Sequence, residues 1–403
     1  MKLFVNGPLA IEYFMKKILS ACSPGLLFAG YGVVGFLMFL YSWTQVDLGL
    51  TLTQFSFWQT IQKNFQYIGY FQRPFSTVVY CILVIGLFIL YGYAMRCIKN
   101  SRISMRSLKI LIFSIFFLLV FSYPAFSYDF FNYMFTAKTV LLYGKNPYQV
   151  TPLQFTGFEP WLSFMHWTHR PSAYAPVWIL LTLPAYIFSF GYFLLILWNL
   201  KVTIGFFYLL TAWGIGQILR DDNETNRLSG IALFALNPLI LIESLVSGHN
   251  DIVMAASAIV ALLVLWKKKY VYSFFIFALS VALKEITIIL APLYFLRKSR
   301  LIPFLLMSVG LISFLIIFKR EMLPWYGIWV LPFAALVPNI GLYMPLVYGF
   351  SSGLLFYYAP FLYFGHWNDP VPVMKFWLTI LPMVIAFIYT ITKYFYSYIR
   401  EKR

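Results

Sequence analysis

Charged side chains are scarce in this sequence. Only 11% of its 403 residues are Asp, Glu, Lys or Arg, whereas a soluble domain carries about 25%. A surface so poor in charge excludes a soluble globular enzyme, and the apolar content excludes a disordered chain. Cysteines are also few, and Cys22 and Cys81 stand inside apolar runs, so the sequence contains no disulfide framework.

Acidic residues are the rarer charged class, with 13 Asp and Glu against 30 Lys and Arg and a net charge of +17. The basic residues are spread over several short segments and form no single face, so nucleic-acid binding is not expected. Membrane lipids are the expected partner of this charge. Since 61% of the residues are hydrophobic and 21% aromatic, the sequence predicts an all-α polytopic membrane protein with aromatic interface belts.

Apolar runs predict the membrane spans, because a helix needs about 20 residues to cross the hydrocarbon core. Clear runs cover 24–43, 76–95, 108–127, 302–318 and 374–394. Shorter runs cover 229–246, 251–266, 270–283, 285–296, 327–339 and 341–358. The block 176–219 fits one span with in-plane helices or three short spans. We favour three, which makes about 14 spans in total, with 12 as the alternative.

Basic residues in short loops predict the orientation. Lys16 and Lys17 and the basic segments 96–109, 267–269, 297–300 and 393–403 are all expected on the cytoplasmic side. Both termini are then cytoplasmic, and the long loops 44–75 and 128–175 are extracytoplasmic. We expect a single membrane domain over residues 1–403 in the cytoplasmic (inner or plasma) membrane.

The loop 128–175 is the first candidate for a functional site, because long loops in compact proteins are commonly functional. Apolar residues at helical spacing over 130–143 predict an amphipathic helix in the headgroup plane, ended by Gly144. Asp129 stands just before it, between Tyr128 and Phe130. A lone carboxylate among aromatic residues at a membrane boundary is costly to desolvate. Two interpretations stay open, a helix cap and a functional acid.

A second candidate is the predicted outer turn with His249, Asn250 and Asp251. His249 can bind a phosphate or a sugar hydroxyl, or hydrogen-bond its own loop, and Asp251 can cap the following helix. Lys284 lies between two apolar runs, which by default suggests a function. Phosphate binding by Lys284 and a structural ion pair with Glu285 both stay open.

Further candidates flank the later spans. Lys319 and Arg320 oppose the positive-inside trend, which either an anionic ligand or simple snorkelling explains. One more cation, Arg170, and three aromatic residues complete this set: Tyr174, Trp325 and Tyr326. The aromatic rings are suited either to the membrane interface or to a sugar ligand. A metal site has weak support, since no His, Asp or Glu pair shows ligand spacing.

Taken in order, these motifs resemble a known family. They are SYD at 127–129, GKNPY at 144–148, YAP at 174–176, the NPL to GHND run at 237–251, Lys284 and PWYGIW at 324–329. Together they resemble the polyprenyl-phosphate-sugar-dependent membrane glycosyltransferases of the GT-C superfamily, most closely the bacterial α-mannosyltransferases. The resemblance covers about residues 108–330, with 1–107 as an N-terminal two-span addition and 331–403 as C-terminal spans.

The resemblance implies a hexose, with mannose favoured, moved from a polyprenyl-phosphate donor to a glycan or lipid acceptor of the cell envelope. It also implies an extracytoplasmic site, inversion at the sugar carbon, and Asp129 as the catalytic base. The leaving phosphate then needs cations, for which Lys284, Arg170, His249, Lys319 and Arg320 are candidates. No cofactor is required with certainty, although a divalent metal can replace some of these cations.

Three alternatives accompany this hypothesis. In many GT-C enzymes the catalytic acid follows the first span, where this sequence has Asp47, so Asp47 is a rival base. A flippase or transporter for a lipid-linked sugar would also explain the spans and Lys284, although the inverted repeats typical of transporters are not seen. A polysaccharide polymerase or ligase is the third, since it shares the lipid-linked substrate.

Overall fold

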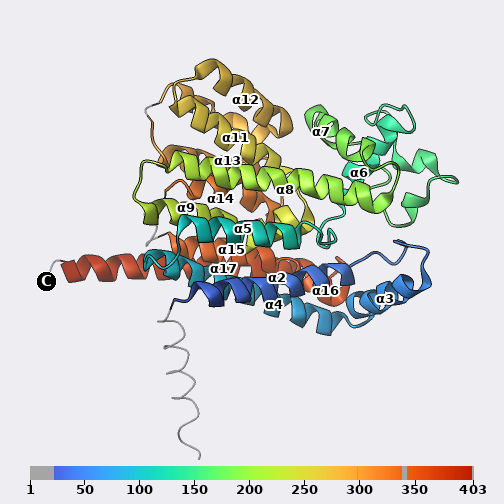
Figure 1. Ribbon diagram of the computed structural model, residues 1–403, viewed down its shortest axis with the longest axis horizontal. Coiled ribbons are helices and arrows are strands. Elements are labelled where there is room, and N and C mark those ends of the chain that lie inside the picture. The colour runs from blue at the N-terminus through green and yellow to red at the C-terminus, as the bar shows by residue number, and fades with distance from the viewer. Residues whose placement is uncertain (1–21, 297, 338–342, 402–403) are drawn as a thin grey trace, which may run out of the picture.

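The fold is helical. The computed structural model describes residues 22–296, 298–337 and 343–401, and over these segments it contains helices and loops but no strand. This confirms the predicted all-α architecture (Figure 1). The predictions on Lys16, Lys17, Arg297, Lys402 and Arg403 lie outside the described residues.

Within the described segments, four helices are long and apolar enough to cross a membrane. They are α2 (Pro24–Thr44), α4 (Arg73–Lys99), α8 (Phe193–Ile218) and α17 (Val371–Glu401). A fifth candidate is a pair bent by 44°, in which α9 (Glu224–Ala235) is followed by Pro238–Ser247. The chain is therefore a multi-pass membrane protein, as the apolar runs predict.

Shorter helices complete the bundle around these five elements. They are α5 (Met105–Leu119), α11 (Asp251–Trp266), α12 (Tyr270–Leu283), the 3-10 helix η5 (Glu285–Tyr294), α13 (Leu301–Ile317), α14 (Gly327–Ala334), α15 (Met344–Phe356) and α16 (Ala359–Phe364). Most follow the predicted apolar runs, but the run from residue 285 forms a tight 3-10 helix and the run from residue 327 begins with a helix of only eight residues.

The apolar block 176–219 forms two helices, which corrects the three crossings that we favoured. One is α8, and the other is α7 (Pro176–Ile187). Twelve residues of α-helix extend only about 18 Å, which is short of the roughly 30 Å hydrocarbon core. The break lies at the turn before α8, where Gly191 has a φ of +82° that favours glycine.

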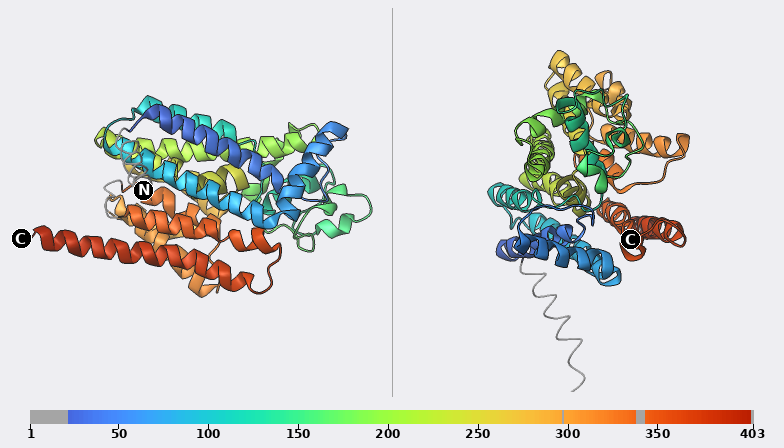
Figure 2. Two further views of the ribbon diagram at one scale, coloured as in Figure 1. Left: turned by 90° about the horizontal axis from the view of Figure 1, so that it is seen from below. Right: turned by 90° about the vertical axis from the view of Figure 1, so that its right-hand side faces the viewer.

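The bundle has two distinct ends. The C-terminal end of α17 and the α8–α9 connection lie at one end (left in Figure 1), which we call the tail end. The opposite end, the loop end, holds α3 (Ser56–Gln66), α6 (Asp129–Leu141) and α7, and the left view of Figure 2 shows the same separation. The two long predicted loops therefore lie together, away from the C-terminal end of α17.

Side-chain contacts link loops at each end. At the tail end, Arg300 Nη1 lies 2.6 Å from Asp222 Oδ2, and the Lys298 ammonium lies 5.4 Å from the Trp266 ring centroid. At the loop end, Ser163 Oγ donates to the Gly49 carbonyl at 3.0 Å. Lys298 and Arg300 thus lie beside Trp266 and Asp222 at the tail end. Which end faces the cytoplasm stays a prediction.

Helices α15 and α17 pack through two glycines spaced four residues apart. A Cβ on Gly349 would lie 2.3 Å from the Ala386 Cβ and 2.5 Å from the Pro382 carbonyl oxygen. A Cβ on Gly353 would lie 2.2 Å from the Thr379 carbonyl oxygen. Small residues at this spacing let two membrane helices approach closely, so these glycines bring α17 against the rest of the bundle.

We predict that Gly349→Val destabilises the protein by about 1–3 kcal/mol, the usual cost of overpacking a tight contact. Thermal unfolding in detergent measures the effect as a lower midpoint. The matched control is Gly32→Val on α2, where no atom lies within 4 Å of a new Cβ. Equal midpoints for the two variants would contradict the close α15–α17 contact.

Candidate active site

A cavity of about 1060 Å³ opens at the loop end. Its wall comes from α6, from the loop after α6, from residues 320–326 and from residues 357–375. Six residues that the sequence singled out line it: Asp129, Arg170, Tyr174, Arg320, Trp325 and Tyr326. Side chains from widely separated parts of the chain therefore share one space.

Asp129 is the first residue of α6, and its side chain lines the cavity. The turn before it is fixed by Ser127, whose Oγ accepts from the Asp129 backbone N–H at 3.3 Å. Burial raises the pKa of the Asp129 carboxyl, while electrostatic interactions with His249 and Lys284 lower it; Asp251 raises it and a hydrogen bond from Tyr174 lowers it. The burial effect is the largest, so the pKa lies above its ordinary value.

Helix α6 is present as predicted, but the loop that follows covers it. Residues 130–139 are all buried, so the helix packs inside the protein instead of lying open in a headgroup plane. Its one basic residue, Lys138, is satisfied internally, with its ammonium 2.8 Å from Glu159 Oε2 and 4.2 Å from the Trp161 ring centroid. The Tyr143 hydroxyl also donates to Glu159 at 2.5 Å. These contacts hold the cavity wall in place.

The GHND turn is held by a buried lysine. The π-helix η4 (Leu241–Ser247) ends at Gly248, whose φ is +77° and whose missing Cβ leaves room for the Phe130 ring. The Lys201 ammonium, from the first half of α8, donates to the carbonyls of Leu245 and Val246. This lysine therefore fixes the backbone just before His249.

His249 lies directly behind the cavity wall. Its ring stacks on that of Trp325, with 4.5 Å between centroids and 23° between planes. Its Nε2 lies 3.1 Å from Glu243 Oε2, and Glu243 also accepts a hydrogen bond from the Tyr358 hydroxyl at 3.0 Å. The neighbouring Asn250 Oδ1 accepts from the Tyr133 hydroxyl at 3.4 Å.

Lys284 pairs with Asp251 and not with Glu285. The Lys284 Nζ lies 2.5 Å from Asp251 Oδ1, and the Trp329 indole N–H donates to the same oxygen. Asp251 is buried, whereas Glu285 is exposed. The chain explains this choice, because α12 ends at Leu283 and Lys284 is extended, so successive side chains point apart.

Five predicted residues thus form one electrostatic group, in which Asp129 interacts with Tyr174, His249, Asp251 and Lys284. Lys319 does not join it, because its side chain is exposed and outside the cavity lining.

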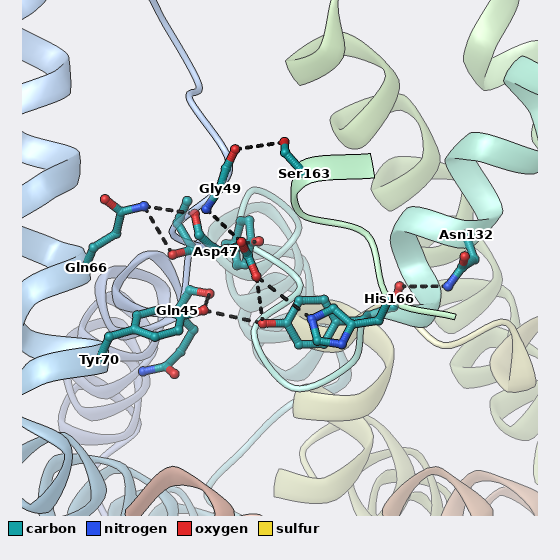
Figure 3. Close-up of polar contacts among 11 residues, drawn as sticks. Gln45, Asp47, Gly49, Gln66, Tyr70, Asn132, Ser163 and His166 are labelled. Carbon is teal, nitrogen blue, oxygen red and sulfur yellow. Dashed lines mark hydrogen bonds and ion pairs between the residues drawn. The ribbon is translucent and has the colours of Figure 1, made fainter. Parts of the chain in front are cut away.

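Asp47 has a different environment (Figure 3). Its Oδ1 accepts from the Gly49 backbone N–H at 2.8 Å, and its Oδ2 accepts from the Tyr128 hydroxyl at 3.3 Å. His166 approaches the same oxygen at 3.9 Å. Asp47 is not among the residues lining the cavity. It therefore ties the two long loops together beside the cavity.

Sequence reasoning missed Arg73, at the start of α4. Arg73, Arg170 and Arg320 all line the cavity, and in the part of the chain that the structure describes none forms an ion pair with a carboxylate. The signal in the sequence is a basic residue in a predicted outer loop, against the positive-inside trend. Three unpaired guanidinium groups suit an anionic ligand.

No His, Cys, Asp or Glu side chains gather in threes to hold a metal ion within segments 22–296, 298–337 and 343–401. The charged groups that line the cavity are mainly guanidinium groups and carboxylates from separate elements.

Comparison with known proteins gives one match. A protein-family model described as alpha-(1->6)-mannopyranosyltransferase, N-terminal domain, matches residues 29–298. No curated protein and no solved structure matches. The matched segment includes Asp129, the GHND turn and Lys284, but it ends before Arg320 and Trp325.

We predict that Lys284→Met destabilises the protein by about 3 kcal/mol, because it leaves the buried Asp251 carboxylate without its cation. The measurement is thermal or denaturant unfolding in detergent. Adding Asp251→Asn to Lys284→Met removes the stranded charge and should restore much of the loss.

The matched control is Lys319→Met, since Lys319 is exposed and forms no ion pair with the described carboxylates. We expect little change there. A Lys284→Met protein as stable as the Lys319→Met protein would contradict a structural role for the pair.

Proposed function

Since the chain belongs to the alpha-(1->6)-mannopyranosyltransferase family, we propose that it transfers mannose from a polyprenyl-phosphate donor to a hydroxyl of a glycan or lipid acceptor. The reaction takes place in the loop-end cavity, on the extracytoplasmic side, with inversion at the sugar carbon. The observation that supports this proposal most is a half-buried Asp129 carboxylate in a cavity with three arginines that have no carboxylate partner among the described residues.

Asp129 is the general base in this proposal. A sugar hydroxyl has a pKa far above neutrality, so a carboxylate must accept its proton as the oxygen attacks. A positioned base contributes about 10²–10⁴-fold to the rate. The raised pKa of Asp129, caused chiefly by burial, makes this carboxylate a stronger base than an exposed one, while His249 and Lys284 favour its ionised form.

The leaving group is the lipid phosphate, which gains negative charge as its bond to the sugar breaks. Arg73, Arg170 and Arg320 supply guanidinium donors without a carboxylate partner among the described residues. A preorganised donor for such charge is worth about 3–4 kcal/mol. Lys284 was a candidate for binding the phosphate, but its ammonium is held by Asp251. In this proposal Lys284 acts on the reaction through its positive charge near Asp129.

Mannosyl transfer needs no reactant other than the donor and the acceptor. The acceptor oxygen forms a bond to C1 of mannose while the bond from C1 to the phosphate oxygen breaks. The acceptor proton passes to Asp129, and the polyprenyl phosphate leaves with the bonding electron pair. One displacement at C1 inverts its configuration, and an activated phosphate needs no acid to leave.

We predict that Asp129→Asn lowers mannosyl transfer by about 10²–10⁴-fold, the contribution of a general base. The assay measures polyprenyl phosphate released from polyprenyl-phosphate-mannose by purified protein with a glycan acceptor. Donor binding and thermal stability should change little, because the amide keeps the size of the carboxylate.

The matched control is Asp47→Asn, which makes the same chemical change beside the cavity but outside its lining. We expect it to retain most of its activity. Loss of transfer in Asp47→Asn alone would move the base to Asp47, and transport of the donor across vesicles without release would instead support a flippase.

We also predict a pH profile. Transfer requires the ionised form of Asp129, so kcat/KM should fall as the pH drops through its raised pKa. Tyr174→Phe removes a hydrogen bond that lowers this pKa, so the acid limb of the profile should move to higher pH.

The comparison is with Tyr192→Phe, where the parent side chain is 69% exposed and outside the cavity lining. Its acid limb should match that of the parent protein. An acid limb that stays in place in Tyr174→Phe would show that Asp129 does not govern the profile.

A further inference from the structure

We propose that Glu321, Tyr357, Trp367 and Lys375 form a subsite that binds the acceptor glycan. All four line the loop-end cavity, and all four follow residue 298, where the family match ends. The proposal rests on the proposed function, because it assigns the second substrate of that same cavity.

Aromatic rings form the floor of this subsite. The Trp367 ring stacks on Phe361, with 4.4 Å between centroids and 17° between planes, and Tyr357 lies 6.2 Å from Trp367. Trp367 nevertheless stays 47% exposed. An aromatic side chain held rigidly at a cavity wall offers a flat apolar surface at low entropic cost, on which the C–H face of a sugar ring can pack.

A fixed carboxylate lies beside the rings. Glu321 Oε1 lies 2.8 Å from the Lys375 ammonium, and its Oε2 accepts from the Tyr357 hydroxyl at 3.3 Å. The Glu321 side chain is still 47% exposed, so the carboxylate keeps lone pairs that can accept hydrogen bonds from sugar hydroxyls.

Lys375 neutralises this carboxylate from behind. Its side chain is only 13% exposed, and its ammonium lies 5.0 Å from the Trp367 centroid and 5.2 Å from the Tyr357 centroid. Cation–π contacts of this kind hold the ammonium in place. The charges of Glu321 and Lys375 therefore offset each other, and the carboxylate lies next to an aromatic surface, which suits an uncharged polyol.

The size of the cavity agrees with two substrates. Its volume of about 1060 Å³ lies just above the roughly 300–1000 Å³ usual for small-molecule sites. A donor sugar beside Asp129 and an acceptor sugar on Trp367 can therefore occupy it together. The acceptor would extend from the C-terminal wall toward the base.

The test compares the purified parent protein with Trp367→Ala and Glu321→Gln, using α-(1→6)-linked mannotriose as the acceptor and polyprenyl-phosphate-mannose as the donor. We expect the acceptor KM to rise roughly tenfold in each variant, as for one well-packed binding residue, while the donor KM stays the same. An unchanged acceptor KM in both variants would overturn the proposal, as would an equal rise in both KM values.

The matched control is Trp377→Ala. Trp377 is exposed to a similar extent, at 51%, and is outside the cavity lining. Its acceptor KM should equal that of the parent protein. An equal rise in Trp377→Ala would show a general loss of structure and would overturn the assignment of Trp367.

Measuring mannotriose binding in the absence of donor tests the acceptor subsite separately from the transfer reaction. Saturation-transfer NMR with mannotriose alone should show binding by the parent protein and weaker binding by Trp367→Ala. If the parent binds mannotriose in this way but transfers no mannose, the subsite stands and the transfer reaction fails. If the parent transfers mannose but Trp367→Ala binds mannotriose equally well, the subsite fails and the transfer reaction stands.

Discussion

The partly buried ion pair between Lys284 and Asp251 is the interaction on which the arrangement of the site depends. It joins the first turn of α11 to the break between α12 and η5, and the Trp329 indole adds α14 to the same carboxylate. A buried pair gains little stability over an apolar contact, but it fixes three elements in one register. It also places a positive charge close enough to influence Asp129. Structure and reactivity thus depend on the same two side chains.

The cavity is built from two parts of the chain, and only the first of them matches the family model. The segment that matches the family model supplies Asp129, Arg73, Arg170 and Tyr174. The segment after residue 298 supplies Arg320 and the aromatic wall around Trp367. In such a site the matched segment can supply the reacting groups, while the segment after residue 298 selects the acceptor.

Much of the fold could be predicted from the sequence, because a lipid solvent imposes a simple rule on helix length and polarity. The apolar runs predicted the long helices, and the rare polar residues predicted Asp129, His249 and Lys284 as members of one group. The partner of Lys284 could not be predicted, since Asp251 is 33 residues away and only tertiary packing joins them. Arg73 and the two-helix form of 176–219 were missed for the same reason, because cavity walls and helix breaks are set by neighbouring elements.

Lys201 has a consequence for how the chain enters the bilayer. Its ammonium is buried in the first half of α8 and is satisfied by backbone carbonyls 44 and 45 residues later. A lysine at the centre of an isolated membrane helix costs about 2.5–3.5 kcal/mol, and α8 alone does not contain the carbonyls that satisfy Lys201. The position of α8 in the bilayer therefore depends on its contact with η4, which supplies the partners of Lys201.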